Sequence, residues 1–342
     1  MLKWNPELLL DHSRYWGSIV ELVPRKRLEL YSGRAHAQLA NEVASNLDVV
    51  LGDVTLKEFA DGEIHCRFGE SVRGKDIFII QTHSGPVNDS LMEQLIMVDA
   101  AKRASAKRIT AVCPYYGYSR QDRKASGREP ITAKLVADMM AAAGADRIIA
   151  LDLHSGQIQG FFDGPVDHLT AMPVLIDYLK RKADQETVIV APDAGRVKVA
   201  SRFSQILNCD LAFVHKRRPR GVANVVEALD VVGEVEGRRC VIIDDMIDTA
   251  GTICAAADLL MSRGASEVWA MATHGLLSDP AAKRLTESSI SRVVITNTLP
   301  VTPEKNIDKL EVLSVAPIIA QAIGAVFEDS SVSEIFGGEN LS

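Results

Sequence analysis

The chain has 342 residues, 47% of them hydrophobic, and a formal net charge of −7 at pH 7. This length allows two domains with proper cores, the hydrophobic content excludes a disordered chain, and the acidic balance argues against a nucleic-acid partner. Charges interrupt the apolar stretches well before the roughly 20 residues that a membrane span needs, and no cleavable signal pattern is present, so we expect a cytoplasmic protein without a membrane partner. The five cysteines are scattered without a CxxC pair, which supports neither a zinc site nor a disulfide framework.

Two pairs of segments in the chain resemble each other. Residues 33–48 and 195–210 both begin with Gly-Arg and predict a helix followed by Asp and an apolar strand. Residues 132–154 and 252–274, offset by 120 positions, each predict a helix, a glycine C-cap and a strand that ends in histidine. Strands that alternate with helices indicate parallel βαβ units, and two copies indicate two α/β domains of similar plan.

We expect an N-terminal extension over residues 1–27, a first domain over 28–172 and a second over 173–336, each a mostly parallel sheet flanked by helices. In the 120-residue repeat, the basic loop 113–130 corresponds to the acidic turn 244–251. The repeat therefore predicts that one topological position is basic in the first domain and acidic in the second.

The first candidate for a phosphate loop along the chain is GESVRGKD, residues 69–76. Asp76 stands where a P-loop needs Ser or Thr to hold magnesium, and an apolar strand follows instead of a helix. We interpret this segment as a turn before that strand.

Polar residues follow four predicted strands, at the edge where open α/β sheets bind ligands. Any one of them could be an ordinary surface residue, but their common position favours a site. They are Arg120 and Gln121 after ITAV, Asp152 and His154 after RIIAL, Asp193 after TVIVA, and Asp244 and Asp245 after CVII.

His154 and Asp193 are the candidate metal ligands. A neutral imidazole and a carboxylate oxygen can hold Mg²⁺ through one or two direct contacts and several waters. A lone histidine at a strand end is more often structural, and this alternative stays open both for His154 and for its repeat partner His274.

The segment HKRRPRG, residues 215–221, contains four cations together with a proline and a glycine, which predict a loop. A solvated basic loop is the simpler interpretation. Next to a polyphosphate substrate, a loop that closes over the phosphates becomes the stronger one, because phosphoryl transfer needs cations and the exclusion of water.

The segment DTAGT, Asp248 to Thr252, lies between a predicted strand and a predicted helix. Free backbone N–H groups and the helix dipole favour a phosphate there, Gly251 lets the backbone approach it, and Thr249 and Thr252 add hydroxyl groups. The loop has no lysine, which suits a sugar monophosphate better than a triphosphate. Asp244 and Asp245 can accept hydrogen bonds from vicinal sugar hydroxyls, so together these residues predict a ribose phosphate site. The alternative is a capped helix start in solvent.

Taken together, these stretches resemble the ribose-phosphate diphosphokinase family, also called phosphoribosyl pyrophosphate synthetases. The resemblance spans about residues 28 to 336. The segments that carry it are FADGE (59–63), YGYSRQDRK, REPITAKLVA, LDLHSGQIQGFFD, PDAGR, HKRR and DDMIDTAGT, in the order of the family. DDMIDTAGT is the ribose-phosphate signature, which phosphoribosyltransferases share more loosely.

The resemblance implies two domains of the phosphoribosyltransferase type and transfer of the β,γ-diphosphoryl group of ATP to the 1-hydroxyl of ribose 5-phosphate. The products are phosphoribosyl diphosphate, used in nucleotide, histidine and tryptophan biosynthesis, and AMP. It also implies a hexamer built from dimers, with phosphate as activator and ADP as inhibitor. The implied residues are Asp61, Gly62, Glu63, Arg120 and Gln121 for ATP, with Asp61 to Glu63 reaching across a subunit contact; His154 and Asp193 for Mg²⁺; Lys216 and Arg218 for catalysis; and Arg218, Asp244, Asp245, Asp248, Thr249, Ala250, Gly251 and Thr252 for ribose 5-phosphate.

Residues 1–27 have no counterpart in the family, and Arg196 and Ser155 replace a glycine and an alanine that are common there. Two rival functions remain. A phosphoribosyltransferase shares the acidic loop but would need only one domain. A non-catalytic regulatory homologue should have lost metal or loop residues, whereas His154, Asp193, Lys216 and Arg218 are all present.

Overall fold

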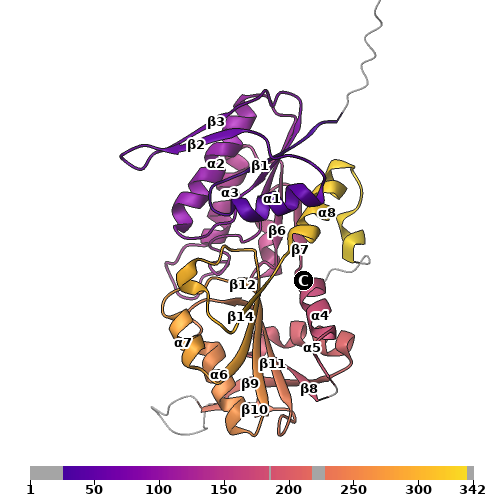
Figure 1. Cartoon of the computed structure of the whole chain (residues 1–342). Helices are drawn as coiled ribbons and strands as arrows, with labels where there is room; N and C mark the ends of the chain where they lie inside the picture. Colours follow the sequence, from indigo (N-terminus) through magenta and orange to yellow (C-terminus); the bar gives the residue numbers. More distant parts are fainter. Residues whose placement is uncertain (1–25, 185, 218–227, 337–342) are drawn as a thin grey trace, which may run out of the picture.

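The structure is a computed structural model that describes residues 26–184, 186–217 and 228–336. It contains two large sheets, one in each half of the chain, with helices on both faces of each (Figure 1). This agrees with the expected α/β architecture. Residues 1–25, most of the predicted N-terminal extension, lie outside the described part.

The first sheet has five parallel strands in the order β1-β4-β5-β6-β7. Strand β4 is apolar on both faces, as parallel sheets require, since Ile77 and Ile79 pack on one side and Phe78 and Ile80 on the other. Helices α2 and α3 cover the first side and α1 covers the second. The elements are β1 (Leu28–Ser32), α1 (Ala37–Asn46), β4 (Asp76–Ile80), α2 (Val87–Arg103), β5 (Arg108–Cys113), α3 (Thr132–Ala143), β6 (Arg147–Leu151), η2 (Gly156–Phe161) and β7 (Val166–Leu169).

An antiparallel hairpin of β2 (Val54–Glu58) and β3 (Ile64–Phe68) is inserted before β4. It packs on α2, and its far end extends away from the body of the protein (Figure 1). The segment 69–76 forms the turn that leads from this hairpin into β4, with Gly74 at φ +71°, which confirms the interpretation of GESVRGKD as a turn.

The second sheet has seven strands in the order β10-β9-β8-β11-β12-β13-β14, all parallel except β10. Helices α4 and α5 cover one face, and α6 and α7 cover the other. The elements are α4 (Met172–Lys180), β8 (Thr187–Ala191), η3 (Ala194–Arg196), α5 (Val197–Leu207), β9 (Asp210–Arg217), β10 (Ala228–Val232), β11 (Arg239–Ile247), α6 (Gly251–Ser262), β12 (Glu267–Gly275), α7 (Ala281–Glu287), β13 (Ile290–Thr296), η4 (Pro303–Lys305) and β14 (Leu310–Leu313).

After β14 the chain returns to the first half. Helix α8 (Ala316–Phe327) lies beside α1 and covers Phe78 and Ile80 of β4, and η5 (Val332–Phe336) follows it (Figure 1). Residues 316–327 thus complete the core of the first sheet, although a division of the chain at residue 172 assigns them to the second domain. The apolar pattern of a helix does not specify which sheet it covers.

The two sheets have a similar strand order, but the 120-residue repeat pairs strands that do not correspond in that order. Strand β1 has Leu51 bridged to it on one side and β4 on the other, just as β8 has β9 and β11. In this alignment β4 corresponds to β11 and β5 corresponds to β12. The loop 113–130 follows β5, whereas the acidic residues 244–251 lie at and after the end of β11. The two segments therefore occupy different topological positions, and the prediction that they share one is wrong. The 33–48 and 195–210 pair is the one that matches, since α1 follows β1 and α5 follows β8. A helix with a glycine C-cap and an apolar strand is a local pattern that carries no information about its place in the sheet.

Hydrogen bonds from mostly buried side chains join the halves. The Thr82 hydroxyl donates to Thr298 O (2.7 Å), and the Thr273 hydroxyl donates to the Asp152 carboxylate (2.6 Å). The site described below lies along this contact. Among the described residues, no helix is long and apolar enough to cross a membrane.

Candidate functional site at the meeting of the two sheets

The carboxyl ends of strands from both halves meet around a cavity of about 270 Å³. Its lining comes from the loops after β5 and β6, the turn after β8, and the end of β11 with the start of α6. The predicted residues that it brings together are Arg120, His154, Asp193, Asp244, Asp245, Asp248, Thr249, Ala250, Gly251 and Thr252. Most residues that line this cavity are therefore ones that the sequence singled out.

The loop 248–252 is built to offer hydrogen-bond donors. Two of its carbonyl groups already have hydrogen-bond donors in the second half. Asp248 O accepts from Ser278 N (3.1 Å), and Thr249 O accepts from Arg284 Nη1 (2.9 Å). No side chain caps α6, and Ala250 adopts a left-handed conformation (φ +60°) just before it. The first N–H groups of a helix have no partner within the helix, so this helix start can bind an anion.

Asp244 and Asp245, at the end of β11, share one cation. Arg196 Nε lies 3.1 Å from Asp244 Oδ1, and Arg196 Nη2 lies 2.6 Å from Asp245 Oδ2. Burial, together with the neighbouring Asp245, raises the pKa of Asp244. Burial also acts to raise the pKa of Asp245, but the hydrogen bond with His154 and the charge of Arg196 outweigh it and hold that pKa well below its usual range.

His154 belongs to the first half and faces Asp245 of the second half. Its Nδ1 is 2.7 Å from Asp245 Oδ2, which places the ring proton on Nδ1 and leaves the Nε2 lone pair for another partner. A carboxylate behind a histidine in this way is the usual second partner of a metal-bound imidazole.

Asp193 follows β8 and is exposed. Its Oδ1 accepts hydrogen bonds from Gly195 N (2.8 Å) and Arg196 N (3.2 Å), so it caps η3. No group of three or more acidic, histidine or cysteine residues suited to a metal occurs in the described part of the chain. Two protein ligands on one cavity still fit Mg²⁺, which commonly keeps several waters and takes further oxygens from substrate phosphates.

Arg120, a predicted ATP residue, forms an ion pair with Asp248 of the predicted sugar phosphate loop (Nη1 to Oδ2, 2.6 Å). Burial acts to raise the pKa of Asp248, but the hydrogen bond from the Ser278 side chain and the pair with Arg120 outweigh it and lower that pKa. Asp248 therefore has a cation as its partner in the loop, which agrees with a turn-forming role better than with direct contact to a phosphate.

The remaining ATP candidates are not brought to this cavity within the described chain. Asp61, Gly62 and Glu63 are exposed at the tip of the β2–β3 hairpin, where Gly62 adopts φ +91°. Gln121 follows Arg120 in the same loop, and its Oε1 accepts from the Thr132 hydroxyl at the start of α3 (2.6 Å). Arg218 and the side chain of Lys216 lie outside the described residues.

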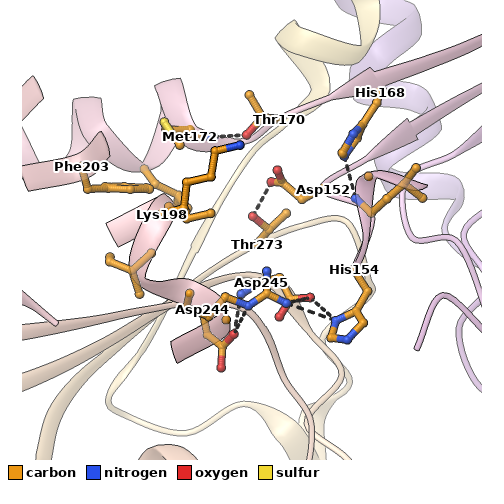
Figure 2. A pocket seen from close by; sticks show the side chains of 17 residues that line it. Asp152, His154, His168, Thr170, Met172, Lys198, Phe203, Asp244, Asp245 and Thr273 are labelled. Atoms are coloured by element: carbon orange, nitrogen blue, oxygen red, sulfur yellow. Dashed lines mark hydrogen bonds and ion pairs between the residues drawn. The ribbon is translucent and has the colours of Figure 1, made fainter. Parts of the chain in front are cut away.

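A second cavity of about 200 Å³ shares His154, Arg196, Asp244 and Asp245 with the first. Figure 2 shows Asp244, Asp245 and His154 on one side of it and Asp152, Thr273 and His168 on the other. The Asp152 carboxylate has a structural role, since its Oδ2 accepts hydrogen bonds from Ala171 N (2.9 Å) and from the Thr273 hydroxyl.

His274 is a structural residue. It is buried, its Nδ1 lies 2.9 Å from the Thr298 hydroxyl, and its ring packs edge-on against Tyr115 of the first half. Burial lowers its pKa. The main contributors that sequence reasoning missed are Arg196, which it treated only as a departure from the family, and Arg284. Arg284 lies in the last turn of the short helix α7, and no sequence signal connects it with Thr249.

Two family models match the chain. Residues 28–144 match the N-terminal domain of ribose phosphate pyrophosphokinase, and residues 216–337 match the phosphoribosyl synthetase-associated domain. The chain is 56% identical over 318 residues to a ribose-phosphate pyrophosphokinase of Streptomyces coelicolor, with 93% of this chain and 98% of that protein covered. It is 55% identical over 317 residues to one from Mycobacterium leprae, covering 92% and 97%.

A solved structure is similar over nearly the whole chain. The crystal structure of phosphoribosylpyrophosphate synthetase from Mycobacterium smegmatis has a TM-score of 0.85 and 53% sequence identity, and the match covers 89% of this chain and 100% of that one. The resemblance stated from sequence motifs is thereby confirmed, as is the fold of phosphoribosyltransferase type.

Proposed function

The chain belongs to the ribose-phosphate pyrophosphokinase family, and we propose that it transfers a diphosphoryl group from ATP to ribose 5-phosphate at the cavity between its two halves. The product is phosphoribosyl pyrophosphate, a precursor in nucleotide biosynthesis. The observation that supports this best is the loop 248–252, an uncapped helix start directly after two buried acids.

Ribose 5-phosphate lies along the second half. The 5-phosphate binds the N–H groups and hydroxyls of residues 248–252, and Asp244 and Asp245 accept hydrogen bonds from the vicinal sugar hydroxyls. The carbonyl groups of this loop point to Ser278 and Arg284, so few acceptors oppose the anion. This orientation brings the 1-hydroxyl toward the part of the cavity that His154 and Asp193 line.

ATP lies on the side of the first half. Arg120 and Gln121 reach it from the loop after β5, while Asp61, Gly62 and Glu63 reach the ATP of a second subunit. The exposed hairpin tip in Figure 1 supports such a contribution, because within one chain it is separate from the cavity. His154 Nε2 and the Asp193 carboxylate would hold Mg²⁺, which when bound neutralises charge on the polyphosphate.

In the reaction, the 1-hydroxyl of the sugar attacks the β-phosphorus in line, the bond between the α- and β-phosphoryl groups breaks, and AMP leaves. Such chemistry depends on positioning and on stabilising charge. Lys216 and Arg218 supply cations to the transferring group, and Arg218 also reaches ribose 5-phosphate. Assembly in the cytoplasm as a homohexamer built from dimers, activation by phosphate and inhibition by ADP complete the proposal, and they rest on the family alone.

The test is to incubate the protein with ATP, Mg²⁺ and ribose 5-phosphate and to measure AMP. We expect AMP that forms only with the sugar, and a large loss of this activity in Asp245→Asn. The control is Arg103→Met, an exposed residue on α2 that contacts Asp99. Folded protein without AMP would favour a regulatory homologue, and phosphoribosyl transfer to a base without use of ATP would favour a phosphoribosyltransferase.

A further inference from the structure

Arg196 contacts three residues of the site at once. Besides its bonds to Asp244 and Asp245, its Nη2 lies 3.1 Å from His154 Nδ1. This third contact is proximity without a hydrogen bond, because the proton on Nδ1 is donated to Asp245. The side chain is only 17% exposed and the Asp245 side chain 7%, so this pair is largely shielded from water. Charge-assisted hydrogen bonds are stronger in such surroundings than at an open surface.

The position of Arg196 is well defined by its backbone. Arg196 is the last residue of η3 and directly precedes α5, and its N–H group is bound by Asp193 Oδ1. The short turn between β8 and α5 therefore carries both a candidate metal ligand and the guanidinium, and it places the guanidinium against the end of β11.

Neighbouring side chains on a strand point to opposite faces, and two adjacent carboxylates repel each other. A common partner is needed to hold both at one cavity. Arginine is suited to this task because its planar group presents donors in a fixed fork, here Nε to Asp244 and Nη2 to Asp245. Lysine offers a point charge that can serve one carboxylate well.

We propose that Arg196 is a positioning residue for ribose 5-phosphate, which orients the Asp244 and Asp245 carboxylates so that they accept hydrogen bonds from the vicinal sugar hydroxyls. The inference rests on the proposed function of these two acids. The Arg196 side chain lines the cavity together with the two acids, and its proposed role includes no direct contact with the phosphate or with ATP.

The experiment compares Arg196→Met and Arg196→Lys with the unaltered protein and with the Arg103→Met control. Binding of ribose 5-phosphate alone is measured by titration calorimetry, and KM for each substrate and kcat are measured in the AMP assay. For Arg196→Met we expect the Kd and KM for ribose 5-phosphate to rise about ten- to hundredfold, the scale of a lost hydrogen bond to a charged group. Arg196→Lys should recover part of this loss, while the KM for ATP should change less than about threefold.

The outcomes separate the two proposals. If Asp245→Asn abolishes sugar binding while Arg196→Met binds as tightly as the unaltered protein, the role of Arg196 is refuted and the proposed function stands. If Arg196→Met and Arg196→Lys lose sugar and ATP affinity equally, Arg196 has a general structural role and the inference is also refuted. If the unaltered protein makes no sugar-dependent AMP, the proposed function itself fails.

Discussion

His83 is expected to make the stability of the protein depend on pH. It follows β4, its side chain is fully buried, and both ring nitrogens are bound. Nδ1 accepts from Gly117 N (2.8 Å), and Nε2 donates to Gln94 Oε1 (2.8 Å). The amide of Gln94 is itself oriented by its donation to Ile79 O (3.1 Å), so the neutral ring with its proton on Nε2 is the form that fits. A second proton, on Nδ1, would face the N–H group of Gly117.

Burial lowers the pKa of His83 from 6.5 to about 4. The unfolded chain takes up a proton at His83 as pH falls through 6.5, whereas the folded chain does so only near pH 4. Between these values the unfolded state binds more protons, so stability falls as pH falls, with a slope of about 1.4 kcal/mol per pH unit. The total contribution lost between pH 7 and pH 4 is about 3 kcal/mol.

The assay is urea unfolding followed by far-ultraviolet circular dichroism at several pH values from 7.5 to 4, for the unaltered protein and for His83→Asn. Asparagine can still accept from Gly117 N but does not titrate. We expect the variant to be less stable at pH 7.5 and the difference to shrink by about 3 kcal/mol toward pH 4. His36, His168 and His274, whose pKa values are also lowered by burial, remain in both proteins and cancel. Stability curves that stay parallel over this range would refute the reasoning.

Three further predictions concern other parts of the molecule. Arg108→Ala should lower the unfolding free energy by about 2 to 3 kcal/mol in urea titrations, because it removes both hydrogen bonds to the buried carboxylate of Asp76. Arg103→Ala, at an exposed position of α2, should lower it by less than about 1 kcal/mol, and equal losses for the two variants would contradict this. Phe203→Ala should cost about 3 to 5 kcal/mol in the same titration, since the ring is 1% exposed in the core under α5, and a loss below about 1 kcal/mol would show that the site collapses. Lys216→Ala should lower kcat in the AMP assay far more than it raises KM, and near-normal turnover would exclude its proposed catalytic role.

Much of the fold follows from local patterns in the sequence. A glycine after a helical pattern predicts the end of that helix, and Gly144 indeed ends α3 with φ +118°, a conformation that favours glycine. The apolar run after it forms β6. The placement of polar residues at strand ends was predictable as well, because parallel strands share their carboxyl edge. Asp193, Asp244 and Asp245 indeed line one cavity.

Interactions between distant segments could not be predicted in this way. Arg196 and Asp245 are 49 positions apart, and their contact depends on β8 lying beside β11 in the second sheet. Arg120 and Asp248 are 128 positions apart, and their contact depends on how the two sheets face each other. The same holds for α8, because its apolar residues do not specify which sheet they cover. A single sequence records which side chains are apolar or charged, and it does not record which partner each one meets.

The arrangement of these pairs also explains why the site needs both halves. His154 and Arg120 come from the first sheet, and their partners Asp245 and Asp248 come from the second. Each acid lines the cavity from the second half and thereby fixes a cation or an imidazole of the first half. A rotation of one half relative to the other would break both pairs at once and leave the Asp245 carboxylate, which is almost fully buried, with Arg196 as its remaining charged partner. Since a buried charge that loses a partner is costly, these two pairs favour the alignment of the two halves that the structure shows.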